Sequence, residues 1–77
     1  MDIYERARNN IIYYRKLNNY TQQELADLSG YTHGYIRSIE SKKVAEGFSL
    51  GTLENIAKAL NVTTSDLVSE NTSLINQ

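Results

Sequence analysis

Apolar residues recur every three or four positions along most of this 77-residue chain, which is the spacing of one face of an α-helix. In residues 3–16 the spacing predicts a single buried stripe, made by Ile3, Ala7, Ile11 and Tyr14. Asn18 and Asn19 follow, and asparagine tolerates the left-handed conformation that often closes a helix. We therefore predict a first helix over residues 3–16, ended by the two asparagines.

A second helix is predicted between Thr21 and Gly30. Thr21 is a good N-cap, and Glu24 lies three residues later, which is the spacing of a capping box. Gly30 ends the segment because glycine supplies the positive φ that a tight helix exit needs. The apolar residues of this helix are Leu25, Ala26 and Leu28.

A third helix is predicted to begin after Thr32, a second capping residue, and to carry the apolar pair Ile36 and Ile39. Two short helices joined by about three residues, with a glycine in the joint, describe a helix-turn-helix. Ala26 is small where the two helices would cross closely. The residues expected to point inward and hold this unit on the core are Leu25, Tyr31, Ile36 and Ile39.

Two more helices follow a predicted loop over residues 41–48. The fourth is capped by Ser49 or Thr52, and its apolar face is formed by Leu53, Ile56, Ala57 and Leu60. The fifth is short, is capped by Thr64 or Ser65, and carries Leu67 and Val68. No segment has the alternating pattern of a strand. The sequence thus predicts an all-α domain of five helices over residues 1–69 and a polar tail over residues 70–77.

Composition limits the classes of function. The chain has no cysteine, so neither disulfides nor thiolate metal sites are expected. No apolar run approaches the roughly 18 residues that span a membrane, and no secretory leader is evident, so we expect a cytoplasmic protein. The net charge is −1, with a mildly basic first half and an acidic second half. This distribution is also typical of ordinary solvated surfaces, so charge alone does not predict a partner.

The outer face of the third helix carries the clearest functional signal. With Ile36 and Ile39 buried, helical geometry turns a polar and cationic set of side chains outward. This set consists of Gly34, Arg37, Ser38 and Ser41, with His33 and Tyr35 at its flanks. Such a face cannot contribute to the core, yet the major groove of DNA admits a helix and offers it donors and acceptors.

The segments "TQQELADLSGYTHGYIRSIE" at 21–40 and "SLGTLENIAKALNVTTSDL" at 49–67 resemble the helix-turn-helix of the phage Cro and repressor family, also called the XRE-like family. The resemblance implies a five-helix, lambda-repressor-like domain that regulates transcription by binding double-stranded DNA. It also implies a homodimer that reads a pseudo-palindromic operator through the helix at about residues 32–41. The chain departs from the family in a loop about two residues longer, which lacks the usual proline. It departs again at Gly34, where the family usually has a side chain.

The candidate DNA contacts combine this resemblance with the chemistry of the residues. Arg37 can either bond the O6 and N7 atoms of guanine or contact the DNA backbone, and the sequence does not decide between the two. Lysines after the helix can neutralise phosphates. His33 is the only histidine and has no cysteine beside it, so a metal site is not predicted. The predicted DNA-binding residues are Gln22, Thr32, His33, Gly34, Tyr35, Arg37, Ser38, Lys42 and Lys43.

The resemblance implies two further roles. Arg15 and Glu40 match an ion pair that ties the first helix to the end of the third. The apolar residues Leu67, Val68, Leu74 and Ile75 are candidates for a dimer interface, and the alternative for the first two is that they complete the core of one molecule.

A second class of function remains open, in which the same fold is a protein-interaction module or an antitoxin component. The net charge and the bare Gly34 favour it slightly. An enzyme is not predicted, because the single histidine has no evident partner and there is neither a phosphate-binding glycine loop nor a metal-ligand cluster. No cofactor is expected.

Overall fold

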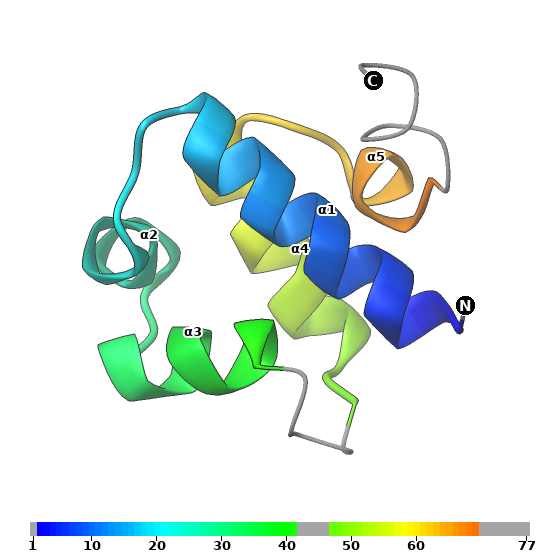
Figure 1. The fold of residues 1–77 in the computed structure, drawn as a ribbon, viewed down its shortest axis with the longest axis horizontal. Helices are drawn as coiled ribbons and strands as arrows, with labels where there is room; N and C mark the ends of the chain where they lie inside the picture. The colour runs from blue at the N-terminus through cyan, green and yellow to red at the C-terminus, as the bar shows by residue number, and fades with distance from the viewer. Residues whose placement is uncertain (1, 42–46, 70–77) are drawn as a thin grey trace.

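The computed structural model describes residues 2–41 and 47–69 of the chain, and the regular elements of these residues are five helices without a strand. They are α1 (Ile3–Leu17), α2 (Gln22–Ser29), α3 (His33–Glu40), α4 (Leu50–Leu60) and α5 (Thr64–Val68), shown in Figure 1. The predicted all-α, five-helix fold is therefore confirmed. The expected domain limit at residue 69 stays a prediction, since residues 70–77 lie outside the described part.

The N-terminus of each helix is fixed by a side chain that accepts a hydrogen bond from the first turn. Thr21 and Glu24 form the predicted capping box of α2, with bonds of 3.0 and 2.8 Å. Of the two residues proposed to cap α4, Ser49 does so. The prediction for α5 was one or two residues late, because Thr63 is the cap and makes a capping box with Asp66. A third capping box joins Asp2 and Glu5, where the backbone amide of Glu5 lowers the pKa of the Asp2 carboxyl.

Three of the helices, α1, α2 and α4, are followed by a residue with positive φ. Gly30 closes α2 with φ of 84°, as predicted. Asn19, after α1, and Asn61, after α4, adopt φ of 60° and 62°. This conformation costs asparagine less free energy than it costs most other residues, so the chain turns sharply at these points without a glycine.

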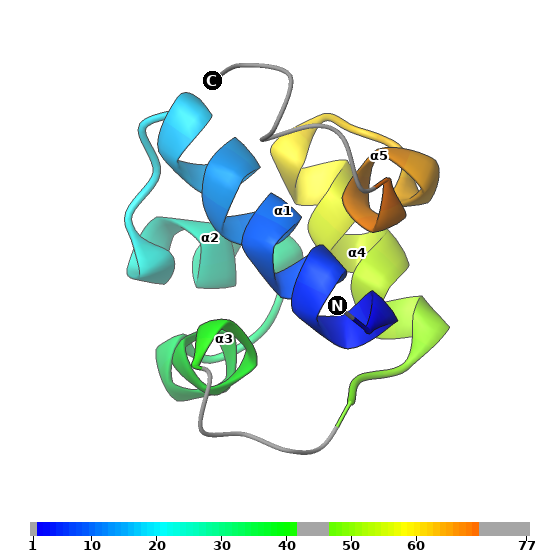
Figure 2. The ribbon, with the colours of Figure 1, turned by 45° about the vertical axis from the view of Figure 1, so that its right-hand side comes forward.

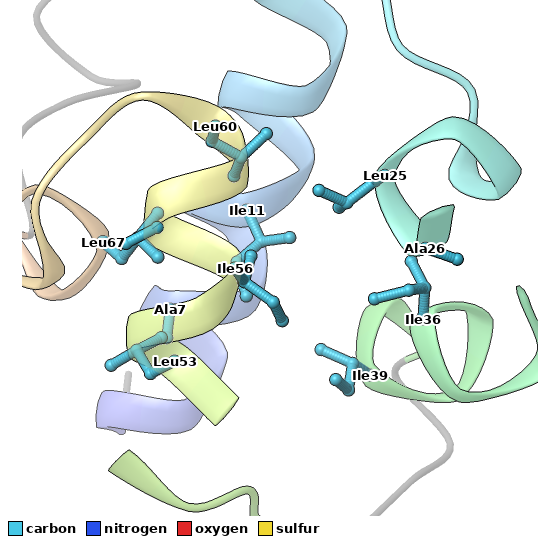
Figure 3. Packing of buried hydrophobic residues seen from close by; sticks show 11 residues of the cluster. Ala7, Ile11, Leu25, Ala26, Ile36, Ile39, Leu53, Ile56, Leu60 and Leu67 are labelled. Carbon is cyan, nitrogen blue, oxygen red and sulfur yellow. The ribbon is translucent and has the colours of Figure 1, made fainter. Parts of the chain in front are cut away.

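The core lies between α1 and α4 on one side and the α2–α3 unit on the other, as Figure 3 shows. Its fully buried large side chains are Ile11, Leu25, Ile36, Ile56, Leu60 and Leu67. The prediction that Ile3 belongs to the buried stripe on α1 is wrong, because its side chain is 52% exposed. It lies in the first turn of the helix, where it lines an open groove instead of the core.

Two polar side chains of α1 hold distant elements in place. The guanidinium of Arg8 donates to the carbonyl of Ile39 at 3.0 Å, near the C-terminus of α3. The amide of Asn10 donates to the carbonyls of Leu67 and Ser69 at 2.8 and 2.6 Å, at the end of α5. Both side chains are buried, so α1 supplies hydrogen-bonding groups as well as apolar surface to the interior.

Candidate nucleic-acid interface

The α2–α3 unit has the arrangement of a helix-turn-helix. α3 packs against α2 and α1 and lies at the edge of the molecule, which Figures 1 and 2 show from two sides. Ile36 and Ile39 are buried beneath it. Gly34 and Arg37 are exposed on its outer face. A Cβ atom at Gly34 would have no neighbour within 4 Å, so this glycine is not required by packing within the described residues.

The remaining predicted contacts on α3 are partly occupied by bonds within the protein. Thr32 is exposed, and its hydroxyl accepts from the amide of Tyr35 at 3.1 Å, which makes it the N-cap of α3. The hydroxyl of half-buried Ser38 donates to the carbonyl of Tyr35 at 2.7 Å. Each hydroxyl oxygen keeps a further lone pair, so both can still take part in a contact with DNA.

Tyr35 connects α3 to α4. Its hydroxyl lies 3.3 Å from the hydroxyl of Thr52, and its ring centre is 5.0 Å from that of Tyr31. Tyr31 in turn accepts a hydrogen bond of 2.9 Å from the amide of Asn55. The two tyrosines thus fix the orientation of α3.

Arg15 and Glu40 meet as a two-bond ion pair. Their atoms Nε and Oε2 are 2.8 Å apart, and Nη2 and Oε1 are 3.0 Å apart. The side chains are only 12% and 5% exposed. Arg15 also donates to the carbonyl of Tyr20 at 2.9 Å, so one guanidinium joins α1, the α1–α2 connection and the last residue of α3.

Gln22, the first residue of α2, lies beside this pair. Its Nε2 donates to Oε1 of Glu40 at 3.0 Å, and its Oε1 is 3.4 Å from Nε2 of His33. Sequence reasoning missed both contacts. Gln22 lies 18 residues from Glu40 and 11 from His33, and it meets them only when α2 packs against α3, so no local pattern marks these contacts.

Comparison with known proteins agrees with this geometry. A family model described as "Helix-turn-helix" matches residues 11–67, and the curated control protein C.SmaI of Serratia marcescens is 41% identical over 68 residues, which cover 88% of this chain and 79% of the relative. The chain belongs to the XRE-like helix-turn-helix family. It is a DNA-binding transcriptional regulator and not an enzyme. No solved structure matches the chain.

Four of the predicted residues of this helix-turn-helix protein lie outside the described part, namely Lys42, Lys43, Leu74 and Ile75. Leu67 is fully buried in the core, so its side chain is not accessible to a second copy of the chain. Val68 is half-buried and lines the open groove beside Ile3. In the described residues no helix is long and apolar enough to cross a membrane.

Proposed function

We propose that this regulator binds a pseudo-palindromic operator as a homodimer, in the cytoplasm, with α3 of each copy in the major groove. The observation that carries the proposal is the division of α3 into two faces. Ile36 and Ile39 fix one face in the core, while Gly34 and Arg37 leave the other open to solvent. A helix held this way presents a stable surface to the edges of base pairs.

Arg37 is the proposed main base contact. Its side chain is exposed, and a guanidinium matches the two acceptors of guanine in the major groove. Gly34 lies one turn earlier on the same helix and lets the backbone approach DNA closely. The other proposed contacts around this pair are Thr32, His33, Tyr35 and Ser38.

Sequence-independent attraction is assigned to the flanks of α3. Gln22 stands at the N-terminus of α2, where backbone amides favour an anion, and its Nε2 carries a second hydrogen besides the one given to Glu40. Lys42 and Lys43 follow α3 in the sequence. Together these groups would hold the phosphates on either side of the groove.

Homodimer formation is supported by an apolar surface, here called the apolar patch, which consists of the exposed Ile3, Tyr4 and Leu50 and the half-buried Phe48 and Val68. These residues line a groove of about 240 Å³, and Leu50 is 83% exposed. One α3 of eight residues spans only about 12 Å and reads few base pairs. A second copy bound at the patch would bring a second α3 to the DNA, as a two-fold symmetric operator requires.

Selection of bound duplexes from a random pool tests the proposal. The expected result is a short sequence repeated in inverted orientation. Arg37→Ala should weaken binding to that site by about 1–3 kcal/mol and affect random DNA far less. Replacing Lys42 and Lys43 with alanine should weaken binding to all duplexes. It should also reduce the salt dependence by about one unit of slope for each phosphate that is no longer neutralised.

The alternative function predicts the opposite pattern. If the wild-type protein shows no preference among duplexes while Arg37→Ala disrupts a protein complex, α3 is a docking surface for a protein partner. The similarity to a relative named as a control protein favours the regulatory role.

A further inference from the structure

A continuous chain of hydrogen bonds runs from the core-facing side of the helix-turn-helix to the first residue of α3. Both oxygens of Glu40 are bound by Arg15, and Oε1 also accepts from the Gln22 amide at 3.0 Å. Gln22 in turn lies 3.4 Å from His33 through its own Oε1. The ion pair on α1 and α3 is therefore connected to a residue proposed to contact DNA.

The chemistry of Glu40 fixes which way the Gln22 amide points. An ionised carboxylate accepts hydrogen bonds and donates none, so the amide group facing Glu40 must be the nitrogen. The amide oxygen then faces His33. Arg15 neutralises the carboxylate and holds it in place with two bonds, so Glu40 cannot turn away to release the amide.

The orientation of the Gln22 amide determines which ring nitrogen of His33 carries the proton. An amide oxygen only accepts, so the ring nitrogen that faces it, Nε2, must carry the hydrogen. In the neutral imidazole the other nitrogen, Nδ1, is then an acceptor. A histidine with the opposite tautomer would place two lone pairs against each other at this contact.

We infer that Glu40 and Gln22 act as positioning residues for DNA recognition, by holding neutral His33 as an acceptor that selects an exocyclic amino group of adenine or cytosine. The inference rests on the proposed function, because it takes His33 to face the groove. Adenine N6 and cytosine N4 are the donors that the major groove presents, whereas guanine presents only acceptors there. The Arg15–Glu40 pair then contributes to the choice of base as well as to the fold.

The first experiment examines the free protein and does not depend on DNA. Because the chain has one histidine, a ¹H–¹⁵N spectrum of the imidazole at about pH 8 reports on His33 alone. We expect the proton on Nε2, protected from exchange with water. Gln22→Met keeps the length of the side chain, removes both bonds and should abolish the protection.

The matched control is Gln23→Met. Gln23 is the exposed neighbour of Gln22 and bonds to Asp27 on its own helix, so its loss should leave the imidazole spectrum unchanged. A proton on Nδ1 in the wild-type protein, or unchanged protection in Gln22→Met, would overturn the inference.

The second experiment repeats the selection of duplexes at about pH 8 with the wild type, Gln22→Met, Gln23→Met and His33→Ala. In the wild type one position of each half-site should favour adenine or cytosine. Gln22→Met and His33→Ala should both reduce discrimination at that position by about threefold to tenfold, the worth of one hydrogen bond. Gln23→Met should retain it.

The outcomes separate the two proposals. Guanine at that position, or full discrimination in Gln22→Met, contradicts the positioning role of Glu40 and Gln22. An absence of any sequence preference in the wild type contradicts the proposed function, while the imidazole spectrum still decides whether Gln22 fixes the tautomer. Circular dichroism of each variant verifies that it folds.

Discussion

At the scale of single residues, the Arg15–Glu40 pair shows how burial changes the value of an ion pair. Exposed pairs contribute little, since water solvates each partner separately. Here both side chains are almost enclosed, and Arg15 also bonds to the carbonyl of Tyr20. Removing one partner leaves the other as a nearly buried charge without its counter-ion.

Arg15→Met should therefore lower the free energy of unfolding by about 3 kcal/mol. The double variant Arg15→Met with Glu40→Leu should recover much of this loss, because it leaves no buried charge behind. Urea unfolding of the wild type, both single variants and the double variant measures the coupling. A loss below about 0.5 kcal/mol in both single variants would show that the pair behaves as an exposed one.

Replacing either of two glycines of the helix-turn-helix with alanine should change the stability of the fold in opposite directions. Gly34 is helical with free space around it, so Gly34→Ala should stabilise the fold by about 1 kcal/mol. Gly30 has φ of 84°, so Gly30→Ala should destabilise the fold by about 1 kcal/mol. Thermal unfolding measures both.

DNA binding gives Gly34 its functional test. If the glycine permits close approach of the backbone, Gly34→Ala binds the operator more weakly in spite of its higher melting temperature. Equal or tighter binding by this stable variant would exclude that role.

At the scale of elements, α5 depends on a side chain from another helix. It has only five residues, and a helix of this length does not persist alone in water. Asn10 reaches across from α1 and donates to the carbonyls of Leu67 and Ser69 at the end of this helix. Leu67 adds a fully buried anchor.

Asn10→Leu has nearly the same volume but cannot donate, so losing the buried hydrogen bond to Leu67 and the bond to Ser69 should cost about 1–3 kcal/mol. Hydrogen exchange should show that amide protection is lost mainly in α5, while the amides of α2 and α3 stay protected as in the wild type. A loss of protection spread evenly over all helices would mean that Asn10 supports the core as a whole and not this helix in particular.

At the scale of the whole molecule, the apolar patch and the outer face of α3 are the two surfaces that the packing of the monomer does not explain. Leu50, at the N-terminus of α4, is the most exposed large apolar side chain of the described residues. A contiguous exposed apolar surface of this kind is typical of an interaction site. The patch therefore provides the sharpest test of assembly.

Leu50→Ser should shift the protein from dimer to monomer with little effect on the unfolding of the monomer, since the side chain contributes almost nothing to the core. Leu28→Ser is the control, because Leu28 is also exposed but lies outside the patch. Sedimentation over a range of concentrations measures both. A wild-type protein that stays monomeric at high concentration, and binds DNA with one copy per site, would contradict the dimer.

The local features of this protein follow from its amino-acid sequence alone. The capping box of Thr21 and Glu24, the left-handed Gly30 and the inward-facing Ile36 and Ile39 depend on neighbours within one or two turns, so short-range spacing predicts them. The outward position of Arg37 followed from the same geometry. The order of five helices and the family of the chain could be predicted from these signals.

The meeting of residues from different helices is a property of the folded molecule and not of any local pattern. Three findings depend on how whole helices pack. They are the contact of Gln22 with Glu40 and His33, the hydrogen bonds from Asn10 to the end of α5, and the exposure of Ile3. Hydrophobic periodicity specifies which face of a helix is buried, but it does not specify how far that burial extends along the helix. It also says nothing about where polar groups of separate helices find their partners, because those bonds form only after the apolar faces have set the distances between them.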